Sequence, residues 1–438
     1  MISIKLVVGM LLLSLMIATG TIASAQEKHT LSNGLRVILK QNPTSPVIAI
    51  QTFVRTGVLL EPPEQLGISD LTQRLLLKGT ETKTEDEIFE GIENLGVRIG
   101  TGLLPDMTNL SLQATRETLD EALPIYIDVL LHPSFPEREV DRVKDQMIRE
   151  LQAQQDNFFT VIWDNLRQGL YGDFPYALTP TEETVRNISR ETVVRFYRDH
   201  YVPNNMVVVA TGDFEAEAML KRLQQAFGEL EPGELPLRAR VADVLIRDLP
   251  PLSPKENVEI SVERESQVAW MMLGYLGPTV ADPDYPAMKL LNTVLGEGLS
   301  SRLFVELREK RPLAYQVGSF FPSRMANSHF LTYIITPAEA VDQARDGILA
   351  VLDEVRQSGV TAEDLDRSKN FLAGNYVMAH ETTERQAWYL GWWEMLGAGF
   401  EMDQLYPERI RTLNSEDLQE AAKRYFDHYV VSILKPPE

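Results

Sequence analysis

The sequence of 438 residues contains no cysteine. Disulfides, thiol nucleophiles and thiolate metal ligands are therefore excluded. Histidine is also scarce, and no two of the six histidines lie within five positions of each other. A His-x-x-x-His metal pair on one helix therefore cannot occur anywhere in the chain. The histidines are His29, His132, His200, His329, His380 and His428.

Basic residues are few relative to acidic ones. The 42 lysines and arginines face 63 aspartates and glutamates, which gives a formal net charge of −21. Nucleic acids and anionic membrane surfaces are disfavoured as partners, because both require basic patches. The charge is compatible with basic peptides as substrates, although a solvated acidic surface is the simpler explanation.

Long hydrophobic runs are confined to the N-terminus. Lys5 precedes an apolar run over residues 6–17, and Ala23-Ser24-Ala25 fits a small-x-small cleavage site before Gln26. This pattern predicts a secretory signal over residues 1–25, with an uncleaved membrane anchor as the alternative. No later stretch approaches the ~20 apolar residues of a membrane span. We therefore expect an exported protein, in the periplasm, with no membrane span after signal removal.

The chain is long enough for two or three domains. A proline-rich stretch at residues 249–254 indicates a linker, and the pattern of strands and helices repeats beyond it, so that residues 341–375 resemble residues 119–154. These observations predict an α+β fold with two homologous domains, each a mixed or antiparallel sheet packed with helices. The predicted parts are a signal at 1–25, an N-terminal domain at 26–245, a linker at 246–257 and a C-terminal domain at 258–438.

Residues 67–80 predict a helix that ends in a Lys-Gly-Thr turn. Leucines recur in it at helical spacing, and Gly79 stands where a helix C-terminus favours positive φ. Three polar residues at i, i+3 and i+4 share one face of this helix, namely Asp70, Gln73 and Arg74.

This segment resembles the zinc-binding helix of the pitrilysin/insulinase family of metallopeptidases, which includes the mitochondrial and bacterial processing peptidases. The family motif is H-x-x-E-H, and here its positions hold Asp70, Gln73 and Arg74. Glu150, on a predicted long helix 76 residues beyond Arg74, matches the third ligand of the family. The resemblance therefore implies a degenerate zinc site that holds no metal. It also implies the loss of the general base, because the neutral amide of Gln73 cannot accept a proton from water.

The replaced residues suggest what occupies the position of the zinc. Asp70 could ligate a hard cation with help from Glu150, but Arg74 is always protonated and disfavours a divalent ion beside it. We predict instead that Arg74 pairs with Asp70 one turn earlier and with Glu150 from the long helix. The alternative is a set of surface charges separated by solvent.

A second segment, residues 300–317, resembles the C-terminal signature S-S-R-L-F…L-R-E-x-x-x-L-A-Y-x-V of the family. In that family an arginine and a tyrosine seven positions apart reach the substrate across a closed cavity, and here they are Arg308 and Tyr315. Both side chains are hydrogen-bond donors that could hold the peptide or stabilise an oxyanion. The alternative is structural, with Arg308 paired to nearby acids and Tyr315 packed under its strand.

The resemblance extends over essentially the whole mature chain. It implies that each domain forms part of one half of a clamshell, and that residues 96–102 form the edge strand that pairs with the substrate backbone. The residues assigned to this strand are Gly100, Thr101 and Gly102.

Together these features imply a function for the chain. Two-subunit members of the family place zinc in one subunit and the Arg/Tyr pair in the other. This chain is similar to the non-zinc subunit of an exported heterodimeric endopeptidase, inactive alone, with an H-x-x-E-H homologue as partner, zinc in that partner, and peptides as substrates. The alternative is an inert peptide-binding or scaffold protein of the same fold. No motif for a different active site or cofactor is present.

Two features of the C-terminal part carry less weight. His380 and Glu384 are four residues apart, but two ligands do not make a zinc site. The aromatic residues around Trp388 predict a core-facing helix, with a subunit interface as the alternative.

Overall fold

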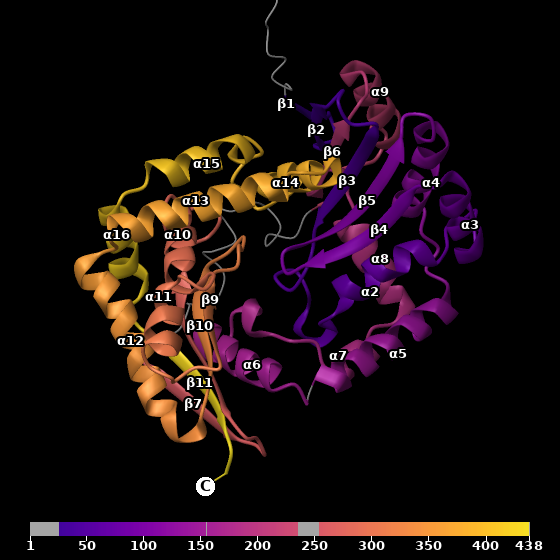
Figure 1. The fold of residues 1–438 in the computed structure, drawn as a ribbon. Helices are drawn as coiled ribbons and strands as arrows, with labels where there is room; N and C mark the ends of the chain where they lie inside the picture. The colour runs from indigo at the N-terminus through magenta and orange to yellow at the C-terminus, as the bar shows by residue number, and fades with distance from the viewer. Residues whose placement is uncertain (1–25, 155, 235–253, 438) are drawn as a thin grey trace, which may run out of the picture.

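The computed structural model describes residues 26–154, 156–234 and 254–437. The predicted signal at 1–25 and most of the predicted linker lie outside these residues. The described chain forms two β-sheets, each packed with helices, in two halves that Figure 1 shows side by side. The predicted α+β class is confirmed.

The first sheet has six strands in the order β1-β2-β6-β3-β5-β4. Strands β2 and β6 are parallel, and every other neighbouring pair is antiparallel. Strand β3 is almost entirely buried, as its run of apolar residues requires, whereas β4 lies at the sheet edge and is partly exposed. The strands are β1 (Gln26–Thr30), β2 (Arg36–Gln41), β3 (Val47–Arg55), β4 (Arg98–Leu104), β5 (Met107–Thr115) and β6 (Met206–Gly212).

The second sheet repeats this topology without a counterpart of β1. Its order is β7-β11-β8-β10-β9, with β7 and β11 parallel and the other pairs antiparallel. Strand β9 therefore holds the edge position that β4 holds in the first sheet, which supports the predicted duplication. The strands are β7 (Val258–Glu263), β8 (Ala269–Gly277), β9 (Gln316–Phe320), β10 (Ser328–Thr336) and β11 (Val430–Lys435).

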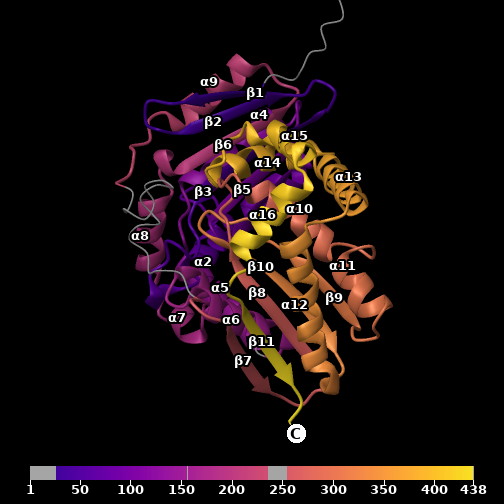
Figure 2. The same cartoon turned by 90° about the vertical axis from the view of Figure 1, so that its left-hand side faces the viewer.

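Amphipathic helices cover one face of each sheet, and Figure 2 shows α12 lying across the second sheet. Around the first sheet lie α2 (Ile68–Leu75), α3 (Glu85–Leu95), α4 (Leu119–Leu131), α5 (Glu137–Gln154), α7 (Glu182–Arg186), α8 (Arg190–His200) and α9 (Ala216–Phe227). Around the second lie α10 (Tyr285–Gly296), α11 (Arg302–Phe304), α12 (Val341–Ser358), α13 (Ala362–Ala379), α15 (Met402–Thr412) and α16 (Ser415–Tyr425). The pair α12–α13 matches α4–α5, as the repeated pattern predicted.

The two halves exchange one helix each, which the sequence did not predict. Helix α6 (Phe158–Tyr171) packs on β8 and β11 of the second sheet, and α14 (Thr383–Met395) packs on β3 and β6 of the first. A glycine allows each close approach. A Cβ on Gly169 would lie 2.6 Å from a methyl of Val430, and a Cβ on Gly391 would lie 2.1 Å from the ring of Phe53. One hydrophobic cluster consequently contains residues of both halves.

Within the described residues, no helix combines the length and the apolar character that crossing a bilayer requires.

Candidate functional site

The helix that resembles the zinc-binding helix is α2. Leu71 and Leu75 are fully buried on its inner face, and a 3₁₀ turn continues it to Lys78. Gly79 follows with φ of 142°, as predicted for the end of this helix. The predicted helix and turn are confirmed.

The N-terminus of α2 is held by a buried carboxylate. Both oxygens of Glu61 accept hydrogen bonds of 2.9 Å, one from the backbone N–H of Gly67 and one from that of Ser69. Burial raises the pKa of Glu61, although these hydrogen bonds oppose the shift. The start of the helix is thereby fixed to the preceding loop.

Arg74 joins α2 to α5 through a compact ion cluster. Its Nε donates to Oδ1 of Asp70 at 2.8 Å, while Nη1 and Nη2 donate to the two oxygens of Glu150 at 3.1 and 2.9 Å. Gln73 adds a hydrogen bond of 2.9 Å to the same oxygen of Asp70, and Gln146 donates to Glu150 at 2.9 Å. The predicted pairing of Arg74 with both carboxylates is confirmed, and it is not a solvent-separated arrangement.

The cluster shifts the titration of its members. Hydrogen bonding from Arg74 holds the pKa of Glu150 below its usual value, although desolvation opposes the shift. Burial by itself lowers the pKa of Arg74, but the hydrogen bonds to Glu150 and Asp70 raise it further above its already high value. Both groups therefore stay charged at neutral pH.

These residues do not fit a zinc ion. The guanidinium already binds the carboxylate oxygens that a metal would need, and it carries a positive charge that is not released. Gln73 is buried and supplies an amide where the family has a carboxylate base. In the part of the chain that the structure describes, no group of three histidine or acidic side chains is arranged to hold a metal.

Arg308 and Tyr315 lie in the other half of the molecule. Arg308 belongs to a π-helical turn at Val305–Glu309, a geometry that is often found at functional sites. Its guanidinium stacks on the ring of Phe304 at 5.1 Å and makes no ion pair within the described ranges. Tyr315 donates its backbone N–H to Ile335 at 2.9 Å just before β9, and its side chain is 57% exposed. Neither side chain has the packed or ion-paired environment of the structural alternative.

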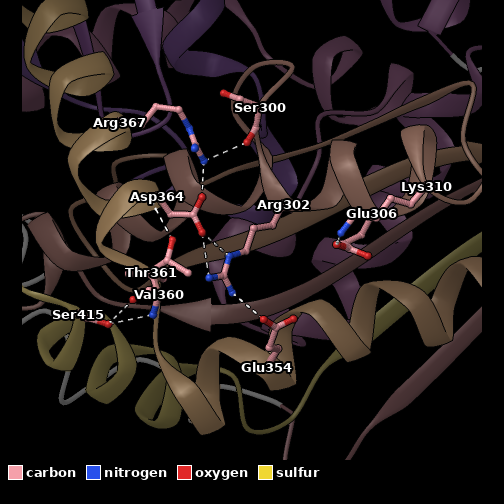
Figure 3. Close-up of polar contacts among 10 residues, drawn as sticks. All are labelled: Ser300, Arg302, Glu306, Lys310, Glu354, Val360, Thr361, Asp364, Arg367 and Ser415. Carbon is pink, nitrogen blue, oxygen red and sulfur yellow. Dashed lines mark hydrogen bonds and ion pairs between the residues drawn. The ribbon is translucent and has the colours of Figure 1, made fainter.

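A partly buried arginine, Arg302, anchors the segment that carries this pair. Arg302 is only 12% exposed, and it pairs with Asp364 at 3.0 Å and Glu354 at 3.5 Å (Figure 3). Arg367 donates to the backbone carbonyl of Ser300 at 3.1 Å and also contacts Asp364. Although burial opposes the shift, the hydrogen bonds from Arg367 and Arg302 lower the pKa of Asp364. Sequence reasoning missed this anchor, although Arg302 belongs to the S-S-R-L-F stretch.

The predicted edge strand is β4. It contains Gly100, Thr101 and Gly102, and among the described strands it pairs with β5 alone, on one side. A strand at a sheet edge presents backbone groups that can pair with an extended peptide. Its location at the edge is confirmed, and its use by a substrate stays a prediction.

The structure brings together some of the predicted site residues and separates others. Asp70, Gln73, Arg74 and Glu150 form one cluster on α2 and α5. Arg308 and Tyr315 follow α11 in the chain. Figure 1 shows α11 in the opposite half from α2 and α5. The two groups are therefore distinct surfaces of one chain.

Contacts between the halves are a further feature that the sequence did not reveal. Asp106, in the turn between β4 and β5, accepts hydrogen bonds from the hydroxyl of Tyr176 and, at 3.2 Å, from the backbone N–H of Met325. Glu394 of α14 is buried and binds Arg36 at 3.1 Å and Lys28 at 3.3 Å. The β4–β5 hairpin and the exchanged helix α14 are thus tied to the opposite half by polar contacts.

His380 has a structural partner other than Glu384. Its Nε2 lies 2.7 Å from Oδ1 of Asp403, and its ring stacks on Tyr389. On the aromatic helix, Trp392 and Trp393 are buried, as a core-facing helix requires.

Comparison with known proteins places these features in context. A family model described as insulinase (peptidase family M16) matches residues 36–181, and one described as the peptidase M16 inactive domain matches residues 187–372. An uncharacterized zinc protease of Bacillus subtilis is 26% identical over 94% of this chain and 98% of its own length. A probable mitochondrial-processing peptidase subunit beta of Arabidopsis thaliana is 23% identical over 83% of this chain and 69% of its own. The crystal structure of a peptidase M16 inactive domain from Pseudomonas fluorescens has a TM-score of 0.85 and 24% identity, and the similarity covers 94% of this chain and 98% of that one.

Proposed function

Starting from the membership of this chain in the peptidase M16 (insulinase/pitrilysin) family, we propose that it is the non-zinc subunit of a heterodimeric endopeptidase. The observation that carries the proposal is the ion cluster of Arg74, Asp70 and Glu150, which replaces a metal site on an otherwise intact helix. A chain built in this way cannot hydrolyse peptides by the zinc chemistry of its family, so its contribution must lie elsewhere.

That contribution is the pair Arg308 and Tyr315. Both side chains are exposed, and both are hydrogen-bond donors. Facing the zinc site of a partner chain, the guanidinium and the phenol would bind the carbonyl oxygen of the substrate and the negative charge that develops on it. The partner would be a homologue with an intact H-x-x-E-H motif and would hold the zinc, whereas this chain would hold no cofactor.

The substrate class follows from the fold. An extended peptide or unfolded segment would add to the free edge of β4 and bind mainly through its backbone. The acidic net charge favours basic peptides. The predicted signal would place the complex outside the cytoplasm, in the periplasm.

A second candidate is an inert peptide-binding or scaffold protein, which the same free edge of β4 supports. The test is zinc content and peptidase activity of the purified chain, of an intact homologue, and of their mixture. We expect a metal-free, inactive chain and a mixture more active than the homologue alone. Arg308→Ala and Tyr315→Phe should abolish the gain, and Arg311→Ala, at an exposed arginine of the same segment, should retain it.

Three other results are informative. A homologue that is fully active alone and gains nothing from the chain would support the scaffold function. Zinc bound stoichiometrically by the isolated chain would refute the interpretation of Asp70, Gln73 and Arg74. An active mixture that tolerates both substitutions would remove Arg308 and Tyr315 from the mechanism.

A further inference from the structure

A cavity of about 320 Å³ lies between α10, α13, α14 and α15 of the second half. Its walls are mainly aromatic and include Trp388, Tyr389 and Trp392 of α14 and Tyr406 of α15. Aromatic rings offer flat apolar surfaces that bind another ring by offset or edge-to-face contact. The volume is at the lower end of small-molecule sites, which suits a ligand of one residue and not an oligopeptide.

Two opposite charges line this cavity without forming an ion pair. Lys289 of α10 donates from Nζ to the backbone carbonyl of Phe321 at 2.7 Å. The carboxylate of Glu297 accepts hydrogen bonds from Asn292 at 2.6 Å and Thr293 at 2.9 Å. Among the described residues no salt bridge joins Lys289 to Glu297, and each retains capacity for another hydrogen bond.

Polar groups that lack hydrogen-bond partners also face this space. Tyr406 is only 5% exposed, and its hydroxyl makes no hydrogen bond to any residue of the described chain. The same is true of the hydroxyl of Tyr389 and the side-chain amide of Asn375, which line the cavity as well. These polar atoms are open to water, so a polar ligand in the cavity would hydrogen-bond to them in its place.

We propose that this cavity binds an aromatic amino acid as a zwitterion. Its ring would pack against the aromatic walls, its ammonium would contact Glu297, and its carboxylate would contact Lys289. A purely cationic ligand would be repelled by Lys289, and a purely anionic one would be repelled by Glu297. A zwitterion satisfies both charges. This inference does not depend on the proposed peptidase function.

The test is binding of phenylalanine, tyrosine and tryptophan to the full chain by calorimetry. Intrinsic fluorescence adds a second measurement for phenylalanine and tyrosine, because three of the five tryptophans line the cavity. We expect binding of these amino acids, and at least tenfold weaker binding of alanine, which lacks the ring. N-acetylphenylalanine lacks the ammonium and phenylalaninamide lacks the carboxylate, so each should also bind at least tenfold more weakly.

Two variants assign the contacts. Glu297→Gln should weaken phenylalanine binding at least tenfold but should not weaken that of N-acetylphenylalanine, which has no ammonium. Lys289→Met should likewise weaken phenylalanine binding but not that of phenylalaninamide, which has no carboxylate. Glu381→Gln, at an exposed position before α14, should leave all affinities unchanged. The absence of binding at millimolar concentration, or equal affinity for phenylalanine and its two blocked analogues, would overturn the proposal without the need for any variant.

Discussion

Arg74→Ala is the most informative single substitution in the ion cluster of Arg74, Asp70 and Glu150. It removes the hydrogen bonds to Asp70 and Glu150, whose side chains are 20% and 42% exposed. Exposed ion pairs contribute below about 1 kcal/mol, and breaking a buried pair costs about 3–5 kcal/mol. The energy of the half-buried contact to Asp70 should lie between these limits, and that of the solvated contact to Glu150 should lie near the lower one. We therefore expect Arg74→Ala to lower the free energy of unfolding by about 2 kcal/mol.

The measurement is thermal and urea unfolding at pH 7. If the first half unfolds as one unit, 2 kcal/mol corresponds to a decrease in Tm of about 4–8 °C. Arg186→Ala is the matched control, because Arg186 also pairs with a carboxylate four residues away but is 57% exposed. The control should lose less than about 0.5 kcal/mol.

The pH dependence gives an independent check. The pKa of Glu150 is lowered in the folded state, so its contribution is present above the ordinary glutamate pKa of about 4.3 and is lost as the pH falls through the lowered value. The difference between the wild type and Arg74→Ala should therefore be constant from pH 6 to 8 and decrease below about pH 4. Equal losses for Arg74→Ala and Arg186→Ala, or a difference independent of pH, would refute a structural role for the cluster.

Three further changes test other parts of the structure. The triple variant Asp70→His/Gln73→Glu/Arg74→His restores the family motif, and we expect one zinc per chain by elemental analysis. Arg302→Gln removes the anchor of the segment that carries the Arg/Tyr pair, so amide hydrogen exchange over residues 300–315 should become at least tenfold faster while the first sheet stays protected. Glu394→Gln leaves two cations of the first half without a buried counter-charge, and the free energy of unfolding should decrease by about 3 kcal/mol.

Each of these changes has a control and a result that contradicts it. The control for the triple variant is Arg74→His alone, which leaves two of the three motif positions altered and should bind no stoichiometric zinc. If the triple variant is also metal-free, α2 and α5 are not placed to coordinate zinc. The control for Arg302→Gln is Arg411→Gln, which breaks an exposed ion pair and should leave exchange slow. If exchange also stays slow in Arg302→Gln, the segment is held by packing alone. The control for Glu394→Gln is Glu408→Gln, which breaks an exposed ion pair. If Glu394→Gln lowers the free energy of unfolding by less than about 1 kcal/mol, as the control should, the Glu394 contacts do not stabilise the association of the halves.

Local order was predictable from local sequence. The leucine spacing and Gly79 predicted α2 and its turn, because both depend on contacts within a few residues. The pairing of Arg74 with Asp70 follows from spacing on one helix, and the pairing with Glu150 followed from the resemblance to the family. The repeated order of strands and helices predicted the two sheets that share one topology.

Only the tertiary structure decided how distant segments meet. The exchange of α6 and α14 depends on the shapes of Gly169 and Gly391 against facing side chains, and no periodicity encodes such a fit. The hydrogen bond between Asp106 and Tyr176 likewise connects residues that no sequence pattern relates. The same holds for Lys289 and Glu297, which line one aromatic cavity. The sequence by itself indicated the order of helices and strands, the family, and the replacement of the H-x-x-E-H residues by Asp70, Gln73 and Arg74, because these depend on residue type and spacing. The packing of the halves and the aromatic cavity depend on distances between segments far apart in the chain, and these exist only after folding.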